Sequence, residues 1–354
     1  MFTDQLKKLF NILGNNNVRI VGGAVRNHIM GMPINDIDLA TTHSPQVVIN
    51  KLSANNIKVI PTGIKYGTVT AVMDKPYEIT TLRIDDKCDG RHAKVTYTDN
   101  WQQDAERRDF TINSMYMDIE GNIYDYLNGK QDCLNGRVVF IGKANKRIEE
   151  DALRILRFFR FYAYYGKQLD KQSLQACIDN KQLIKKLSIE RVSDEFIKIL
   201  LSPNHIEVLK LLQQHKILPY EYDFNYLNKL KSNNLFARFF AINGNKVQIA
   251  RQLKLSNKQI KTIQLLQDHL DTEPNKKLLR KLNTDNFKLL VQIQYALGQS
   301  VDVVALIKLA DSWDIPQFPI TGADLIKQGY KPGKQLGDKL KELEQKWEDN
   351  NYQF

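Results

Sequence analysis

The sequence predicts an α+β protein in which a domain built on a mixed β-sheet precedes an all-helical remainder. Helix and strand patterns interleave over residues 1–143, whereas strand patterns nearly disappear from residue 144 onward. Residues 1–150 hold 19 Lys and Arg against 18 Asp and Glu, so the other 32 basic and 22 acidic residues give residues 151–354 a net charge of +10. This asymmetry suits either a polyanionic partner along the C-terminal part or a lysine-rich solubilising surface.

Length and composition are those of a globular protein with two or three domains. No apolar run approaches the ~20 residues that span a bilayer, and the first residues, MFTDQLKKLFNIL, predict an amphipathic helix rather than a signal peptide. Cys88, Cys133 and Cys177 lie far apart and form no CxxC, so neither a disulfide framework nor a zinc site is indicated. We therefore expect a cytoplasmic protein that does not associate with membranes.

Residues 18–42, VRIVGGAVRNHIMGMPINDIDLATT, begin with a strand, a glycine pair and a short helix that ends at Gly31. The backbone N–H groups of Gly22 and Gly23 lie where the helix starts, and such a place binds anions such as a triphosphate. A glycine pair before a helix is also an ordinary tight turn. Both interpretations stay open for this pair taken alone.

Two aspartates, Asp36 and Asp38, follow in the same stretch. In a strand their spacing points both carboxylates to one face, while Ile37 and Leu39 point to a core. A solvated edge strand would explain the pair, but two buried like charges need a cation, and Mg²⁺ commonly takes one or two carboxylates plus substrate phosphates. Together with the anion site, the pair predicts nucleotidyl transfer by two-metal in-line displacement.

The rest of the sheet domain adds three candidate residues. Strands are expected at 57–60, 68–73 and 77–84, and in the last of these Glu78 is either an exposed residue or a third catalytic carboxylate. The polar residues 85–100 predict a mobile loop near the site. The pair Arg108 and Asp109 precedes an apolar run predicted to be helical, and its arginine fork either forms a surface ion pair or binds phosphate or ribose oxygens.

The remainder of the chain is predicted to be helical. One helix is expected over residues 148–166, where Asp151, Arg154, Arg157 and Arg160 recur every third residue as a polar stripe. Further helices are expected at 171–187, 190–201, 204–215, 224–240, 246–252, 256–270, 276–282, 285–297 and 301–312. Residues 313–319 predict a linker before a Gly/Pro loop and a final amphipathic helix.

Several motifs now line up in one order. They are GGAVRN, DIDLATT, PTGIKYGTVTAV, EITTLR, DGRH, RRDFTINSM and EEDALRILRFFRF within residues 1–165, and ITGADLIKQGYKPGKQLG near the C-terminus. With this set the chain resembles the class II tRNA nucleotidyltransferases, the CCA-adding enzymes and their poly(A) polymerase relatives. The segments between these two regions match that family only in their helical character and not in sequence motifs.

The resemblance implies a nucleotidyltransferase head over residues 1–143 and a helical neck over 144–200 that recognises the nucleotide base. It further implies a helical body over 201–312 and a helical, tRNA-binding tail over 313–354. It puts the catalytic Mg²⁺ on Asp36 and Asp38, with Glu78 as a further catalytic candidate. The nucleotide-binding candidates are Gly22, Gly23, Arg26, Arg108, Asp109, Asp151, Arg154, Arg157 and Arg160. One departure is Asn27, where the family usually has Asp.

Addition of C and A without a nucleic-acid template requires the protein to recognise the Watson–Crick edge of the base. Cytosine and adenine both offer an amino donor beside a ring-nitrogen acceptor. Asp151 is an acceptor and Arg154 a fork of donors, so the two can accept both bases and leave groups unpaired against G or U. An ion pair between Asp151 and Arg154 on a helix surface is the alternative explanation.

The expected function is template-independent addition or repair of the 3′-terminal CCA of tRNA, using CTP and ATP and releasing pyrophosphate. The expected partner is the 3′ acceptor end of tRNA, with no stable protein partner implied. Within the family, a poly(A) polymerase or an enzyme that adds only CC or only A would share most motifs. A small-molecule nucleotidyltransferase would not need the basic helical half, and a non-catalytic RNA-binding protein would not need Asp36 and Asp38.

Overall fold

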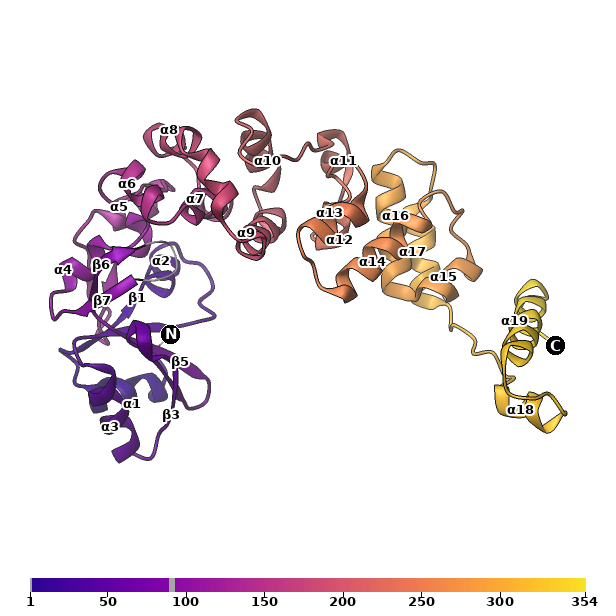
Figure 1. Ribbon diagram of the computed structural model, residues 1–354, viewed down its shortest axis with the longest axis horizontal. Coiled ribbons are helices and arrows are strands. Elements are labelled where there is room, and N and C mark those ends of the chain that lie inside the picture. The colour runs from indigo at the N-terminus through magenta and orange to yellow at the C-terminus, as the bar shows by residue number, and fades with distance from the viewer. Residues whose placement is uncertain (1, 89–92) are drawn as a thin grey trace. The chain divides into compact units, whose positions relative to one another are not determined.

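A mixed sheet organises the N-terminal part of the protein (Figure 1). Its strands are β1 (Val18–Val21), β2 (Asp38–Thr41), β3 (Lys58–Gly63), β4 (Thr68–Val72), β5 (Pro76–Thr81), β8 (Tyr116–Met117) and β9 (Ile123–Tyr124). In the computed structural model, which describes residues 2–88 and 93–354, these seven strands follow the order β3-β4-β5-β2-β1-β8-β9. Only β2 and β5 pair in parallel among the described strands, so the sheet is mixed, as predicted.

Strand register separates an apolar face of this sheet from a polar one. Ile20 lies opposite Leu39 and Leu39 opposite Ile79, and all three are at most 1% exposed. On the other face Asp38 lies opposite Glu78, and both are exposed. Because side chains alternate along a strand, burying the first set fixes the orientation of the two acids.

Helices cover the apolar face. The helices of this region are α1 (Asp4–Leu13), α2 (Gly23–Ile29), α3 (Pro45–Ala54), α4 (Trp101–Glu106) and α5 (Gly129–Asn135), with 3₁₀ turns η1 (Ile64–Tyr66) and η2 (Thr111–Asn113). Helices α1 and α3 contact each other and strands β1, β3 and β4. Their apolar side chains, among them Leu6, Phe10 and Leu52, are fully buried. Helix α4 packs on the other face, where its Ala105 shares a small core with Val21, and the acids lie beside this core.

Three local predictions in this region were wrong. Much of the expected mobile loop at 85–100 is a hairpin of β6 (Arg83–Cys88) and β7 (Ala93–Tyr97), while the DGRH turn lies outside the described residues. The apolar run after Asp109 forms η2 and then β8 instead of a helix, because its backbone pairs with β1 and β9. The residues RVVFIG at 137–142 have a pattern that predicts a closing strand, but they make only isolated bridges.

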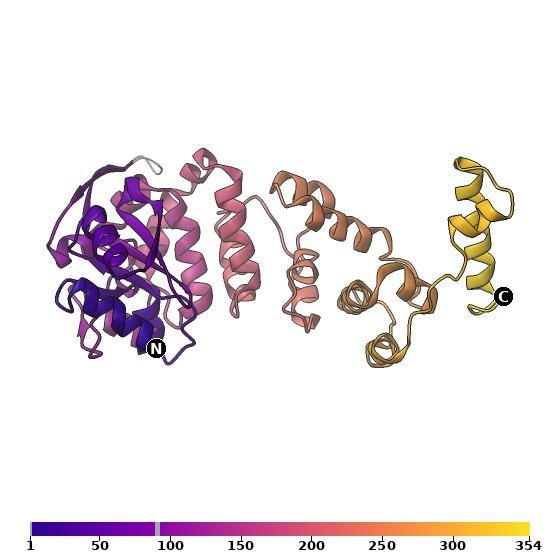
Figure 2. The same ribbon diagram turned by 90° about the horizontal axis from the view of Figure 1, so that it is seen from below.

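The helices after the sheet confirm the predicted change of architecture. They are α6 (Ala144–Glu150), α7 (Leu153–Tyr165), α8 (Lys171–Asp179), the 3₁₀ helix η3 (Lys181–Lys186), α9 (Ile189–Leu201) and α10 (His205–Gln214). Helix α7 packs against α9 and α10, and Figure 2 shows helices of this region side by side. The single helix predicted at 148–166 is interrupted at Asp151, whose extended backbone ends α6.

The chain divides into two compact units, Met1–Pro219 and Tyr220–Phe354. The second contains α11 (Phe224–Lys229), α12 (Leu235–Phe239), α13 (Lys246–Gln252), α14 (Asn257–Asp268), α15 (Lys276–Leu282), α16 (Thr284–Ala296), α17 (Val303–Ser312), α18 (Gly322–Lys327) and α19 (Lys334–Asp349). Helix α16 is central, since it contacts α11, α12, α14, α15 and α17. The finer division into head, neck, body and tail stays a prediction.

The last helix is fastened within the second unit. Arg280 of α15 donates to Glu344 and Glu348 of α19, each at 2.6 Å. The same guanidinium lies 5.0 Å from the ring centre of Trp347, which is 3% exposed. Residues 313–319, the predicted linker, form neither helix nor strand. Among residues 2–88 and 93–354, no helix is long and apolar enough to cross a membrane.

Leu39→Ala tests the buried face of the sheet. Leu39 is 0% exposed on a central strand, so truncation should lower the free energy of unfolding by about 2–5 kcal/mol through lost burial and a cavity. Leu134→Ala, at a side chain that is 54% exposed, is the control and should change it by less than about 0.5 kcal/mol. Urea unfolding measures both, and equal effects would contradict the assigned register.

Candidate active site

A cleft of about 620 Å³ opens between the polar face of the sheet and α7. Its lining comes from strands, from the start of α2, from the segment after α4, and from α7 and α9. It comprises Val21, Gly22, Gly23, Arg26, Asp38, Thr68, Glu78, Thr80, Arg83, Arg107, Arg108, Asp109, Asn113, Asp151, Leu153, Arg154, Arg157, Arg160, Phe161 and Arg191. The structure thus brings together every predicted site residue except Asp36, which lies just before β2.

The carboxylates gather on the sheet side of the cleft. Asp38 and Glu78 lie side by side on the parallel strands β2 and β5. The pKa of Asp38 is raised, first by desolvation and then by the charges of Glu78 and Asp36, while Arg108 opposes the rise. Desolvation and the neighbouring charges of Glu78 and Asp36 thus both disfavour the charged form of Asp38. A bound cation would favour that charged form.

The glycine pair forms the turn from β1 into α2. Gly22 has φ +68°, and its N–H already donates to the carbonyl of Met115 at 3.1 Å. A Cβ at Gly22 would lie 3.7 Å from Nη1 of Arg108. The predicted anion site therefore cannot use the Gly22 N–H, and the nearby guanidinium supplies the positive charge instead.

Asp104, at the end of α4, fixes the two neighbouring arginines. Its carboxylate is 1% exposed and accepts from Arg107 Nε at 2.8 Å, from Arg108 Nη2 at 2.9 Å and from the Tyr116 hydroxyl at 2.6 Å. Burial alone would raise the pKa of Asp104, but Arg108 and Arg107 lower it well below the usual range. Among the described residues Asp109 pairs with Arg157 and not with Arg108, so the alternative of a surface ion pair between Arg108 and Asp109 is not what forms.

The arginines of α7 are each held by an acid from another segment. Arg157 donates to Asp109 from Nε at 2.8 Å and from Nη2 at 2.5 Å. Arg160 donates to the buried Glu195 of α9 at 2.5 Å. Burial opposes ionisation of Asp109, yet Arg157 keeps the pKa of that carboxyl low. The expected polar stripe is confirmed as a row that lines the cleft.

Asp151 and Arg154 lie in the cleft with separate partners. Asp151 accepts from the Leu153 N–H at 3.1 Å and from Arg191 Nη2 of α9 at 2.8 Å. Arg154 donates to Glu150 at 2.6 Å and to the carbonyl of Arg147 at 2.9 Å. In the described part of the chain no ion pair joins Asp151 to Arg154, so the helix-surface pair is not what forms.

Arg26 reaches the cleft from α2 and is only 6% exposed. It donates to Asn113 at 2.6 Å, to the Tyr165 hydroxyl at 2.8 Å and to Asn27 at 3.0 Å. Among the described residues these hydrogen-bond partners are neutral. Asn27 thus holds the guanidinium without neutralising it, and the positive charge of Arg26 remains available to an anionic ligand.

Four functional residues escaped the sequence analysis: Asp104, Glu150, Arg191 and Glu195. Each lies behind or beside a predicted residue: Asp104 is in α4, Glu150 ends α6, and the other two are both in α9. Glu150 directly precedes Asp151 in the EED motif, so the sequence alone could have indicated it. Arg191 and Glu195 lie at least 35 positions from their partners, and only the packing of α9 on α7 brings them there.

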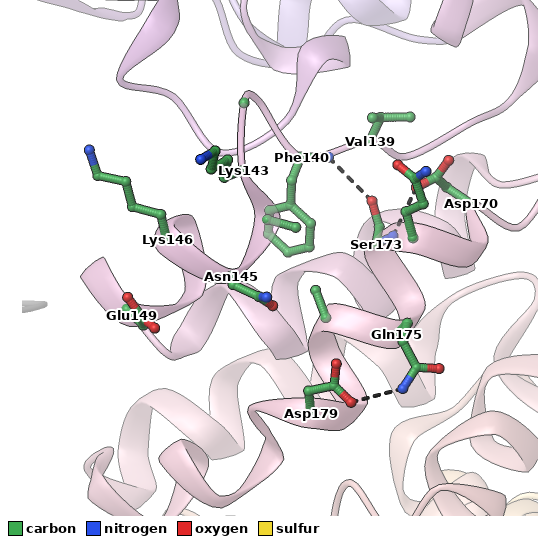
Figure 3. Close-up of a pocket in the computed structure, with 14 residues that line it drawn as sticks. Val139, Phe140, Lys143, Asn145, Lys146, Glu149, Asp170, Ser173, Gln175 and Asp179 are labelled. Carbon is green, nitrogen blue, oxygen red and sulfur yellow. Dashed lines mark hydrogen bonds between the residues drawn. The ribbon is translucent and has the colours of Figure 1, made fainter.

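A second pocket, of about 720 Å³, lies between α6 and α8 (Figure 3). Its side chains include Lys143, Asn145, Gln175 and Asp179, and Gln175 donates to Asp179 at 2.8 Å. It contains none of the predicted site residues. The cleft, rather than this pocket, is therefore the candidate active site.

Three family models match the chain in succession. They are the Poly A polymerase head domain at residues 18–139, the RNA and SrmB-binding site of polymerase A at 167–222, and tRNA nucleotidyltransferase domain 2 at 234–351. The mitochondrial CCA tRNA nucleotidyltransferase 1 of Homo sapiens is 35% identical, with 100% of this chain and 88% of that protein aligned. The chain belongs to the CCA-adding tRNA nucleotidyltransferase family.

Other relatives agree with this family assignment, which confirms the resemblance predicted from the motifs. The CCA-adding enzyme of Lactobacillus johnsonii is 30% identical, with 91% of this chain and 87% of that protein aligned. The crystal structure of the Bacillus stearothermophilus CCA-adding enzyme with CTP superposes with a TM-score of 0.82 at 24% identity, covering 99% of this chain and 94% of that one. Nucleotidyltransferases of this family generally use divalent metals.

Asp104→Asn should destabilise the protein by about 3–5 kcal/mol at pH 7, because two partly buried guanidinium groups lose their counter-charge. The folded-state pKa of Asp104 is lowered, so its contribution is complete above the unfolded pKa and is lost as pH falls. The difference in free energy of unfolding between the variant and the wild type should therefore become progressively smaller below about pH 4. Urea unfolding across pH measures it.

The matched control for this prediction is Asp99→Asn, at an exposed aspartate of the same region. It should change the free energy of unfolding by less than about 0.5 kcal/mol at pH 7. A loss for Asp104→Asn no larger than that of the control would contradict the role of Asp104 as the anchor of Arg107 and Arg108.

Proposed function

We propose that this protein adds or repairs the 3′-terminal CCA of tRNA, with CTP and ATP as substrates and pyrophosphate as product. The observation that carries the proposal is that one cleft contains two features. The sheet contributes carboxylates, and the helical side contributes Asp151 and Arg154, each bonded to a separate partner. The names of the relatives, which are CCA-adding enzymes and CCA tRNA nucleotidyltransferases, support it.

Base selection follows from how Asp151 and Arg154 are held. Arg191 and the Leu153 N–H orient the Asp151 carboxylate, which keeps lone pairs to accept from the amino group of C or A. Glu150 orients the Arg154 guanidinium, whose other N–H groups can donate to the ring nitrogen. Guanine and uracil present a protonated ring nitrogen to this arginine, so both partners would stay unpaired.

The triphosphate would lie against the arginines. Arg108 near Gly22, Arg26 near Gly23, and Arg157 and Arg160 on α7 line one continuous part of the cleft. Acids hold all of these guanidinium groups except that of Arg26, which neutral side chains hold, so the groups are fixed before the ligand arrives and little ordering is needed on binding. These roles, and a role for Asp109 in holding Arg157, are our proposal for the nucleotide-binding residues.

The acids on the sheet fit a divalent cation, and we propose Mg²⁺ held by Asp36 and Asp38. Desolvation and the charges of Glu78 and Asp36 disfavour the charged form of Asp38, and oxygen ligands suit this hard ion. Within residues 2–88 and 93–354 no three acidic, His or Cys side chains are gathered as a metal site, so substrate phosphates would complete the ligand set and Glu78 would assist from beside Asp38. The cation would activate the tRNA 3′-hydroxyl and stabilise the pyrophosphate leaving group.

One experiment separates this function from its alternatives. Transcripts of tRNA that end before CCA, after C and after CC are each offered one labelled nucleotide in a single turnover. Two additions of C followed by one of A, and then arrest, support CCA addition. A long A tail would instead indicate a poly(A) polymerase, and addition of only CC or only A would indicate a partial enzyme.

Asp151→Ala and Arg154→Ala test base selection. Each should lower the use of CTP and ATP and reduce the preference over UTP and GTP by about 5- to 150-fold, equivalent to about 1–3 kcal/mol of lost pairing. Single-turnover rates with each nucleotide measure this. Lys181→Ala, at a lysine in the same unit outside the cleft, is the control. If both variants keep the wild-type preference for CTP and ATP over UTP and GTP, the assignment of Asp151 and Arg154 to base selection is refuted.

Asp38→Asn tests the cation site without an activity assay. Because the folded state raises the pKa of Asp38, its charge costs stability at neutral pH, so the variant should melt at or above the wild-type temperature when no divalent ion is present. Mg²⁺ at 100 times its Kd should stabilise the wild type by about 2.7 kcal/mol and so raise its melting temperature. The melting temperature of the variant should not change. An equal Mg²⁺ effect in both would exclude Asp38 as a ligand.

The cytoplasmic location expected from the sequence stays a proposal. The relatives from Homo sapiens, Mus musculus and Danio rerio are named as mitochondrial. Cell fractionation with an antibody to this chain distinguishes the two compartments.

A further inference from the structure

Two exposed tyrosines are neighbours of residues that line the cleft and have no part in the function proposed above. Tyr66 ends η1 and is 41% exposed, and Tyr97 lies in β7 and is 43% exposed. Tyr66 is two residues from Thr68, and Tyr97 lies opposite Arg83 in the β6–β7 register, and both Thr68 and Arg83 line the cleft. Single exposed aromatic rings are common on protein surfaces, so this position beside the cleft, rather than exposure, points to a ligand.

Backbone contacts hold the two tyrosines together. Arg83 of β6 donates through its guanidinium to the carbonyl of Tyr66 and lies opposite Tyr97 in the β6–β7 register. Gly67, directly after Tyr66, has φ +82°. A Cβ at Gly67 would come within 2.9 Å of Cε1 of Tyr97. The ring of Tyr97 therefore lies over Gly67, beside the backbone of Tyr66.

The tyrosines adjoin the carboxylate side of the cleft. Thr68 follows Gly67 and lies 2.9 Å from Thr80, hydroxyl to hydroxyl. Thr80 is two residues from Glu78 on the same face of β5, and Thr68, Thr80 and Glu78 all line the cleft. The base-selecting Asp151 and Arg154 belong instead to the helical side. A chain that delivers a hydroxyl to Asp38 along β4 and β5 would pass these rings.

We propose that Tyr66 and Tyr97 form a stacking surface for the 3′-terminal bases of the RNA that is extended. This inference rests on the proposed function and names a binding subsite for its RNA substrate. The base at the RNA 3′ end changes as nucleotides are added, so its recognition must tolerate different bases. Stacking on an aromatic ring does so, because every base has a π face, whereas hydrogen bonds to base edges do not.

The experiment uses the full chain and an acceptor-stem RNA hairpin that ends before CCA. Tyr66→Ala and Tyr97→Ala should each lower kcat/KM for the hairpin by about 5- to 150-fold, the range for loss of one stacked base. The KM for CTP should stay unchanged. Tyr66→Phe and Tyr97→Phe keep the ring and should retain wild-type values, whereas Tyr97→Leu keeps apolar volume without a π face and should behave like Ala.

A second measurement reports stacking without turnover. A hairpin with 2-aminopurine as its last base should lose fluorescence when it binds the wild type, and that loss should diminish in both Ala variants. Tyr126→Ala is the control, since Tyr126 is a 36% exposed tyrosine of the same unit that packs on the buried Tyr116 and accepts from Arg19. Melting temperatures identify any Ala variant that is merely unstable. In that case the comparison of the Phe and Leu variants shows whether an aromatic ring is required.

Three results would overturn the inference. Wild-type kcat/KM and quenching in the Ala variants would show that the rings do not contact the RNA end. A raised KM for CTP with unchanged RNA kinetics would place the incoming nucleotide, rather than the RNA, on these rings. A wild-type protein that extends no RNA would refute the proposed function itself, and this outcome is distinct from an active wild type with unaffected Ala variants.

Discussion

The geometry of the cleft depends on buried carboxylates that hold its arginines from behind. Asp104 anchors Arg107 and Arg108, Asp109 anchors Arg157, and the last pair of this kind is Glu195 with Arg160. Each of these acids is at most 8% exposed, so the attraction acts in a poorly hydrated environment and fixes direction as well as charge. Without this support, neighbouring guanidinium groups would repel one another and swing into solvent.

This arrangement explains why the site needs both the sheet and the helices. The sheet provides the acids of β2 and β5 because burial of Leu39 and Ile79 forces Asp38 and Glu78 to the opposite face. The helices provide positive charge and the residues proposed to select the base, and α9 holds Asp151 through Arg191 and an arginine of α7 through Glu195. Opposite charges therefore face each other across a cleft whose walls have separate origins in the sequence.

The sequence predicted the sheet, the change to helices and 11 of the 20 residues that line the cleft, because those residues belong to local motifs. It failed where pairing is long-range. Nothing local indicates that Asp109 would pair with Arg157, 48 positions later, or that Asp151 would interrupt a helix and accept from Arg191. The residues after Asp109 have helical spacing, yet pairing of Tyr116 and Met117 with their neighbours in the sheet outweighs that local preference.

The proposed base selection depends on the local geometry at Asp151, where the helix is interrupted. In an unbroken helix, Asp151 and Arg154 would face each other one turn apart and neutralise one another. The extended backbone at Asp151 instead lets its carboxylate accept from Leu153 and Arg191, while Arg154 donates to Glu150. An acceptor and a donor fork thus remain side by side without satisfying each other. That is the condition under which a ligand with the complementary donor and acceptor pair gains most from binding.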